Sequence, residues 1–377
     1  MQVDDPRRDR CRGVLLGLAS GDRNGGPMRM SIRLVESLLA NTSYQQSDVI
    51  ERYYNWFRGP PHDEEKCFDT GGVFDSVFQL YSRGIPIDEA AERVQKRGGS
   101  VGVNAAHRGS VLSCASFISK QDLFRITREE TYITHANDRS YQVHLAVNLL
   151  CRHLIEGQTW EEALLSVERE ITDDTVITAL KDSKTTKEAD LSVGGYAPEV
   201  LKAALYFLHR SSDFSAALNE SIRFAGPDNY CPVLVGSIGG ARYGGAQVLE
   251  NKSYHLGDNE WISVQLKERL VHLANELATT SNNNRNAQKY GTEEKNPRNQ
   301  IDPTESELCL CWPVIAAFSF TCKGWGYVMV DGVSDVDWNE KASERLVLDQ
   351  ERKDLISAVV EHSETIFSDV VSGRRKD

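Results

Sequence analysis

The sequence predicts an all-α protein, because apolar residues recur with the 3.6-residue period of an amphipathic helix along most of its length. Clear stripes run through residues 30–39, 143–154 and 200–208. Alternating patterns typical of strands are scarce, and Tyr327–Val330 is the best short candidate for one. The bulk of the chain is therefore expected to be helical.

Capping boxes mark where two helical segments begin. Thr159 and Glu162 are spaced so that each side chain can bind the backbone N–H of the other at a helix start. Thr304 and Glu307 repeat this pattern ahead of the apolar segment LCLCWPVIAAFSF, which we therefore expect to be helical. The chain is expected to end in a further helix, whose apolar face carries Leu355, Val359, Ile366 and Val370.

The chain divides into three regions. Residues 10–279 are expected to form one large domain. Residues 280–303 are polar, rich in asparagine and without periodicity, which is typical of a linker or a long surface loop. Residues 304–377 form a predicted C-terminal helical extension. Because about 70 residues make only a marginal core, we expect this extension to pack on the domain rather than fold alone.

The net charge and the lengths of the apolar runs limit which kinds of binding partner and which cellular location we expect. The 377 residues carry a net charge of −12, which argues against a nucleic-acid-binding surface. An anionic ligand would need arginines, helix N-termini or a cation close by. The apolar runs are far shorter than the roughly 20 residues that span a bilayer. The N-terminus has no apolar signal-peptide core, so we expect a cytoplasmic protein without membrane contact.

The cysteines give no disulfide or zinc pattern. They are scattered, and Cys114 and Cys151 sit inside apolar segments, as small buried hydrophobic residues do. Cys309 and Cys311 form a C-x-C pair, but Cys322 stands alone and no second pair lies at zinc-ligand spacing.

Five ordered segments carry a resemblance to a known family. They are RGVLLGLASGDRNGGP at 12–27, FDTGGVFDSVFQLYSRG at 68–84, VGVNAAHRGSVLS at 101–113, ITHAND at 133–138, and the stretch 193–244. In this order they resemble the blocks of the ADP-ribosylglycohydrolase (DraG-like) family. The resemblance implies an orthogonal multi-helix domain. It also implies a hydrolase that cleaves an N- or O-glycosidic bond to an ADP-ribosyl group on a small molecule or a protein.

The resemblance implies magnesium chemistry, yet the sequence departs from the family at the metal motifs. Family members hold two Mg²⁺ ions with the carboxylates of a T-D-D-T and a D-x-D-T motif, and such ions polarise ribose and activate water. Here the first motif is absent, because no carboxylate lies between Asp22 and Glu36. In the second, Pro227 and Asn229 stand at the two aspartate positions and Tyr230 at the threonine. The usual two-metal site is expected to be lost.

A rebuilt magnesium site would depend on the remaining carboxylates, Asp22, Asp69 and Asp228, of which Asp228 lies one position out of register. Asp69 is the best surviving candidate for activating water, and Asp22 is the second candidate for a catalytic role. Asp69 and Thr70 can equally cap the helix that follows them. Asp22 and Arg23 form either a salt-bridged structural pair or part of the ligand site.

The other candidate ligand residues lie in the remaining blocks. Asn104, His107 and Arg108 occupy a glycine-containing loop, where ligand contacts are frequent, and Arg108 offers a fork to a diphosphate. His135 caps a helix, bonds across the core or contacts a ligand. Tyr196 stacks on a base or packs in the core.

Asn229, Tyr230 and Cys231 replace the metal motif as a block and are expected to line a pocket. Tyr230 can donate a hydrogen bond to a phosphate or a ribose. Cys231 at a helix start is either a nucleophile, with His107 or His135 as its base, or a buried inert thiol.

Three functions remain open at this point. The chain hydrolyses an ADP-ribosyl or related linkage with a rebuilt or metal-poor site, or it is an inactive family member that binds ADP-ribose or a nucleotide-like ligand, or it is a structural protein. A cavity that unites Asp69, Asn104 and Arg108 would favour the first two functions. An apolar or filled cavity would favour the third.

Overall fold

The computed structural model describes residues 5–59, 70–99, 101–250, 264–280, 314–319 and 324–329. These residues belong to two compact units, Met1–Glu294 and Lys295–Asp377. In the described part of the first unit every element is a helix, which confirms the predicted all-α class. No helix in the described ranges is long and apolar enough to cross a membrane.

The helices of the first unit follow one another with short connections. The first seven α-helices are α1 Pro6–Gly21, α2 Gly26–Asn41, α3 Gln46–Arg58, α4 Gly72–Tyr81, α5 Ile87–Lys96, α6 Asn104–Gly109 and α7 Lys120–Tyr132. The others are α8 Asp138–Ile155, α9 Trp160–Glu170, α10 Asp174–Asp182, α11 Ala197–Arg210, α12 Phe214–Ala225, α13 Tyr230–Tyr243, α14 Gly245–Glu250 and α15 Val264–Thr279. Short 3-10 helices lie at Ser110–Cys114 and Glu188–Asp190.

Local sequence signals account for where some helices begin. The Thr159 hydroxyl accepts a hydrogen bond from the N–H of Glu162, and the Glu162 carboxylate accepts one from the N–H of Thr159, so the predicted capping box opens α9. Asn137 caps α8 with its side chain, whose Oδ1 accepts hydrogen bonds from the N–H groups of Arg139 and Ser140. The three predicted apolar stripes lie on α2, α8 and α11 and pack in the core.

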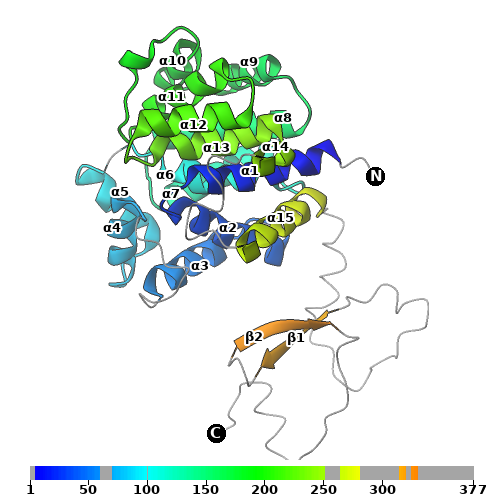
Figure 1. Ribbon diagram of the computed structural model, residues 1–377. Coiled ribbons are helices and arrows are strands. Elements are labelled where there is room, and N and C mark those ends of the chain that lie inside the picture. The colour runs from blue at the N-terminus through cyan, green and yellow to red at the C-terminus, as the bar shows by residue number, and fades with distance from the viewer. Residues whose placement is uncertain are drawn as a thin grey trace, which may run out of the picture. The chain divides into compact units, whose positions relative to one another are not determined.

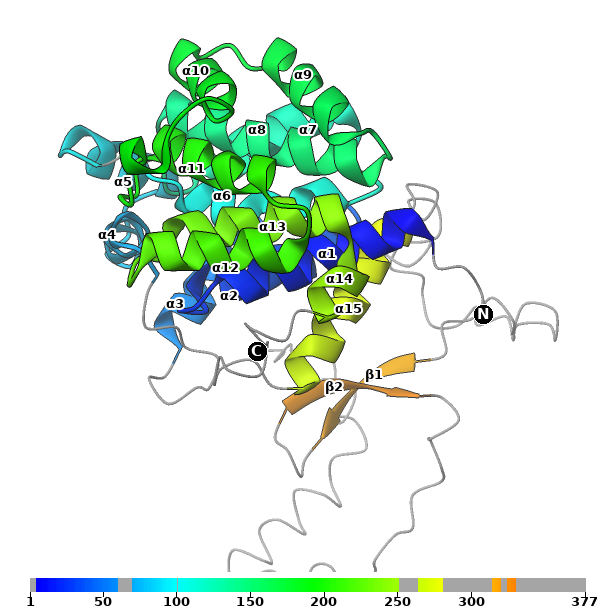
Figure 2. The same cartoon turned by 45° about the horizontal axis from the view of Figure 1, so that its top comes forward.

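α1 and α13 lie side by side at the centre of the unit (Figures 1 and 2). A Cβ on Gly17 would lie 2.1 Å from the carbonyl oxygen of Gly236, and a Cβ on Gly240 would lie 1.9 Å from that of Gly13. Any side chain would therefore push the two backbones apart. The glycines of both helices thus fix how closely the first and the thirteenth helix cross.

The other helices surround this central pair. α9, α10 and α11 lie on one side of it, α2, α3 and α15 on the other, and α4 and α5 at one end (Figures 1 and 2). One hydrophobic cluster extends from Cys11 on α1 to Ala278 on α15. The short helix α6 packs between α2 and α8, which brings its first residues to the surface near α4.

The described part of the second unit is a pair of antiparallel strands, β1 Val314–Ser319 and β2 Gly324–Met329. β2 overlaps the strand expected at Tyr327–Val330. β1 lies within the apolar segment LCLCWPVIAAFSF, for which a helix was expected. Short apolar runs rich in branched and aromatic residues fit both states, and periodicity alone does not separate them. Thr304, Glu307 and the predicted terminal helix lie outside the described residues, as does most of the predicted linker.

Candidate functional site

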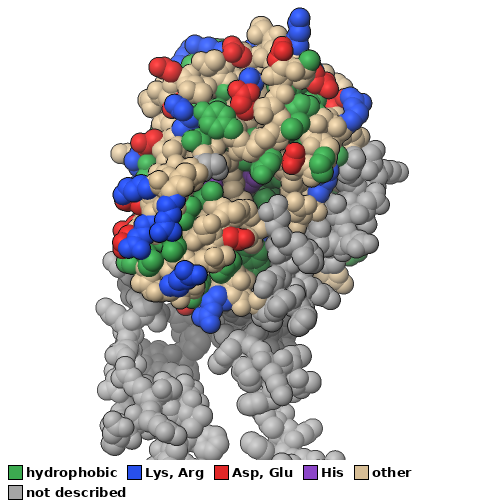
Figure 3. Space-filling view, turned by 90° about the vertical axis from the view of Figure 1, so that its left-hand side faces the viewer, with side chains coloured by type: hydrophobic (Ala, Val, Ile, Leu, Met, Phe, Trp, Pro, Cys, Tyr) green, Lys and Arg blue, Asp and Glu red, His purple; other side chains and the backbone are tan. Residues whose placement is uncertain are grey.

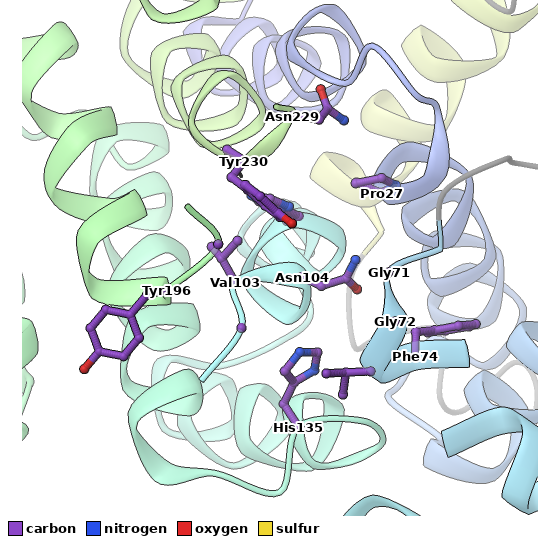
Figure 4. A pocket seen from close by; sticks show the side chains of 14 residues that line it. Pro27, Gly71, Gly72, Phe74, Val103, Asn104, His135, Tyr196, Asn229 and Tyr230 are labelled. Carbon is purple, nitrogen blue, oxygen red and sulfur yellow. Dashed lines mark hydrogen bonds between the residues drawn. The ribbon is translucent and has the colours of Figure 1, made fainter. Parts of the chain in front are cut away.

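A cavity of about 310 Å³ opens on the face that carries α4 and α5. Figure 3 shows a hollow on this face with a histidine at its floor. Each of the five sequence blocks contributes to its lining, which consists of Pro27, Gly71, Gly72, Val73, Phe74, Gly102, Val103, Asn104, His107, His135, Gly195, Tyr196, Asn229 and Tyr230. Segments that are far apart in sequence thus meet at one cavity (Figure 4).

The described lining of the cavity combines apolar groups with a few polar side chains and is uncharged. It contains no Lys, Arg, Asp or Glu. His107 and His135 are both buried, and burial lowers the pKa of each imidazole to about 3. Both histidines are therefore neutral at pH 7, and with so low a pKa neither is an effective general base.

His107 connects α6 to the start of α13. Its Nε2 lies 2.9 Å from the carbonyl oxygen of Tyr230. Because a carbonyl oxygen only accepts, Nε2 carries the hydrogen and donates. The ring of Tyr230 packs on Gly195, where a Cβ would lie 3.0 Å from it. In Figure 4 the Tyr230 hydroxyl points toward the space between Asn104 and Pro27.

Asn104, the first residue of α6, presents its amide nitrogen to the cavity. Its Oδ1 accepts a hydrogen bond of 3.0 Å from Nη1 of Arg108, one turn further along the helix. The amide group is thereby oriented so that Nδ2 faces Gly71 and the carbonyl oxygen of Thr70, which is 3.5 Å away. A contact this long is weak, so the N–H groups of Asn104 remain able to donate to a ligand.

Arg108 does not line the cavity, which corrects the prediction that it binds a diphosphate. Its side chain is completely buried, and Nε donates to the Glu130 carboxylate at 2.6 Å. Tyr53 donates to the same carboxylate oxygen at 3.0 Å. A buried guanidinium requires such a partner, since an unpaired charge in the core is costly. Arg108 orients Asn104 instead of touching a ligand itself.

Asp22 lies at the end of α1, completely buried beside the cavity. Its Oδ1 accepts hydrogen bonds from the N–H groups of Asn24 at 3.2 Å and Gly25 at 2.8 Å, and from Nδ2 of Asn229 at 2.8 Å. Its Oδ2 accepts one from the N–H of Met28 at 2.8 Å. Burial raises the pKa of the Asp22 carboxyl to about 6, and these bonds limit the rise. Both oxygens are engaged by donors of the protein.

Comparison with known proteins agrees with these blocks. A sequence model of the ADP-ribosylglycohydrolase family matches residues 27–287. The chain belongs to this family. A protein named ADP-ribosylarginine hydrolase Tri1, from Serratia proteamaculans (strain 568), is 22% identical over 299 residues, which is 71% of this chain and 80% of that protein. Its namesake from Pseudomonas putida (strain GB-1) is 22% identical over 280 residues, 63% of this chain and 71% of the relative.

A solved structure shares the fold. It is titled ADP-ribosylglycohydrolase-related protein complex, with 20% sequence identity and a TM-score of 0.56. The match covers 72% of this chain and 98% of that one. At this identity the likeness establishes the helical architecture and no more.

The magnesium ions of the family do not fit the described residues. No group of three or more His, Cys, Asp or Glu side chains within the described ranges could hold a metal ion. Asp22 has both oxygens bound to N–H groups, and Asn229 directs its amide nitrogen, a donor, at the Asp22 carboxylate. Asp228 is absent from the described lining of the cavity. Asp69 lies outside the described residues.

Arg23 and Asp228 are absent from the described lining of the cavity, and the Arg23 side chain binds the backbone of the turn that contains Asp228. Arg23 does not form the salt bridge with Asp22 that was one of the two alternatives for this pair. Its Nη1 donates to the carbonyl oxygen of Gly226 at 2.7 Å, and its Nη2 donates to that of Asp228. The N–H of Arg23 donates to Oδ1 of Asn229 at 3.0 Å. Arg23 therefore ties the turn after α1 to the turn before α13.

Thr70 and Cys231 are both absent from the described lining of the cavity. The Thr70 hydroxyl donates to the Asp75 carboxylate and caps no helix, because the N-cap of α4 is Gly71 with φ +82°. Burial raises the pKa of the Cys231 thiol, so the inert alternative holds.

His135 and Tyr196 both contribute to the lining of the cavity. His135 bonds through Nδ1 to the Thr134 hydroxyl at 2.8 Å, and it does not cap α8. Tyr196 is 38% exposed, and Figure 4 shows its ring directed away from the cavity. Its hydroxyl accepts a bond of 3.3 Å from Nη1 of Arg139. This arrangement supports neither of the two alternatives for Tyr196, stacking on a base in the cavity or packing in the core.

Sequence reasoning missed the apolar part of the lining. It did not single out Val73, Phe74 and Val103, or the backbone of Gly71 and Gly72, which all line the cavity. The one available signal was the paired glycine in FDTGG, because the positive φ of Gly71 lets the chain turn beside Asn104.

Proposed function

We propose that this member of the ADP-ribosylglycohydrolase family binds the ribosyl part of an ADP-ribosyl group, free or attached to a protein, in its uncharged cavity. The observation that carries this proposal is the lining of neutral polar groups beside a carboxylate that is already engaged. Ribose hydroxyls both donate and accept, as the Asn104 amide and the Tyr230 hydroxyl do. On this proposal, binding needs no magnesium.

Hydrolysis is the second candidate function, and one observation favours it. Both curated relatives are named ADP-ribosylarginine hydrolase. The chain offers Asp69, which directly precedes Thr70, whose carbonyl oxygen lies beside Asn104. In this function Asp69 would accept a proton from the attacking water. A purely structural role is disfavoured by an open cavity with polar side chains.

The cytoplasmic location remains a prediction.

Calorimetric titration of ADP-ribose, in EDTA and then in MgCl₂, tests the proposal. We expect equal affinity in both buffers and a loss of about fivefold in Asn104→Ala, since one hydrogen bond contributes roughly 1 kcal/mol. Gln79→Ala, at an exposed position on α4, is the control and should bind as the wild type does. Binding only in MgCl₂ would contradict the proposal, and no binding in either buffer would exclude both ligand-based functions.

Turnover of an ADP-ribosylated arginine substrate separates binding from hydrolysis. If hydrolysis occurs, Asp69→Asn should abolish it while ADP-ribose still binds. If the wild type binds free ADP-ribose but releases none from the ADP-ribosylated substrate, the chain is a binding protein. Unchanged turnover in Asp69→Asn would remove Asp69 from the catalytic role.

A further inference from the structure

The contact between Asp22 and Asn229 joins two ends of the domain at the edge of the cavity. Asp22 ends α1, and Asn229 immediately precedes α13, 207 positions further along the chain. Nδ2 of Asn229 donates to Oδ1 of Asp22 at 2.8 Å, while its Oδ1 accepts from the N–H of Arg23 at 3.0 Å. Both ends of this amide are therefore fixed, and its orientation is determined.

A buried carboxylate must be compensated by positive charge or by aligned N–H dipoles. Asp22 obtains three backbone N–H groups from the turn at Asn24, Gly25 and Met28. The fourth donor, Asn229, is the one side chain among them. Among the described residues, no basic side chain donates to Asp22 in this set of hydrogen bonds. The guanidinium of its neighbour Arg23 binds carbonyl oxygens instead.

We propose that the Asn229 amide takes the place of a cation beside Asp22, so that this edge of the cavity is complete without a metal ion. The inference concerns the folded chain itself and does not depend on which ligand the cavity binds. Whether the Asp22 carboxylate is compensated depends on the atom at the Nδ2 position of residue 229. With an oxygen in place of Nδ2, two carboxylates would face each other at hydrogen-bond distance inside the protein, where the repulsion between them is large.

The change Asn229→Asp makes that replacement. Two facing carboxylate oxygens attract a hard divalent cation, which would relieve the repulsion. The variant should therefore lose thermal stability in EDTA and recover it in MgCl₂ or MnCl₂. The wild type should melt at the same temperature in EDTA, in MgCl₂ and in NaCl of equal ionic strength.

Two further variants make the test specific. Asn229→Ala removes the donor without adding a charge, so its melting temperature should fall and stay low with either metal. Asn55→Asp carries the same change of charge at an exposed position on α3 and should show no metal dependence. If Asn229→Asp does not fold in EDTA, expression in the presence of Mn²⁺ followed by chelation gives the same comparison.

Specific results would overturn the inference. One is a wild type that Mg²⁺ stabilises beyond the effect of ionic strength. Another is an Asn229→Asp variant that neither metal restores, or that is as stable as the wild type in EDTA. Because the readout is a melting temperature, failure here leaves the ADP-ribose titration unaffected, and the two proposals can fail separately.

Discussion

Lowering the pH from 8 to 5 should strongly destabilise this protein, because it buries neutral histidines. His107, His135 and His144 are all buried, and burial lowers the pKa of the first two to about 3 and of the third to about 4. Unfolded histidines take up a proton as the pH falls through about 6.5, whereas these folded ones do not until far lower. Stability is therefore complete above that pH and is lost as the pH falls below it.

The size of the effect follows from linkage. A pH of 5 lies about 1.5 units below the pKa of an imidazole in the unfolded chain. Each histidine that stays neutral in the folded state therefore lowers the free energy of unfolding by about 2 kcal/mol. Three of them cost about 6 kcal/mol. Asp22 opposes this trend, since its raised pKa of about 6 lets the folded state take up a proton first, which returns about 1 kcal/mol by the same linkage. A net loss of about 5 kcal/mol is a large part of the 5–15 kcal/mol of a typical domain.

Urea unfolding at a series of pH values measures this loss. The free energy of unfolding should be flat from pH 8 to 7 and fall steadily below. His144 lies outside the described cavity lining. In His144→Gln the loss of unfolding free energy between pH 8 and 5 should be smaller by about 2 kcal/mol. His272→Gln, at an exposed site on α15, should leave the slope unchanged. A wild-type free energy that stays constant down to pH 5 would refute the reasoning.

Other substitutions test the packing directly. Gly17→Ala drives a Cβ into Gly236 and should cost about 3 kcal/mol or more in urea unfolding; an unchanged midpoint would mean that the crossing of α1 and α13 is wrong. Arg108→Met leaves Glu130 buried without its partner and should cost roughly 3–5 kcal/mol, whereas adding Glu130→Gln should recover much of it; equal stability of the single and double variants would argue against the ion pair. Thr159→Ala removes the capping box of α9 and should lower stability by about 1 kcal/mol in thermal unfolding; no change would contradict the cap.

Helices and caps were predictable because their signals are local. The stripes on α2, α8 and α11 depend only on residues three or four apart, and the box at Thr159 and Glu162 spans a single turn. β1 shows the limit of such signals. Its six residues are too few to distinguish a helical period from an alternating one, so the expected helix at Val314–Ser319 was wrong.

The site was predictable in outline and not in detail. The order of the sequence blocks anticipated that Asn104, His135 and Tyr230 belong to one region, and they do share a cavity. Side-chain direction is set by partners far away in sequence. Arg108 turns inward because Glu130 supplies the charge that it needs, and nothing in the loop GVNAAHRG reveals that partner. Asn229 is likewise defined by Asp22 and Arg23.

The crossing of α1 and α13 also governs when this protein can fold. α1 leaves the ribosome first, yet its partner is synthesised more than 200 residues later. Until then the glycine face of α1, which packs on α13 in the folded domain, has no partner helix. Contacts this distant in sequence slow folding and prolong the exposure of apolar surface. A product that ends before Tyr230 therefore lacks the helix against which the glycines of α1 pack.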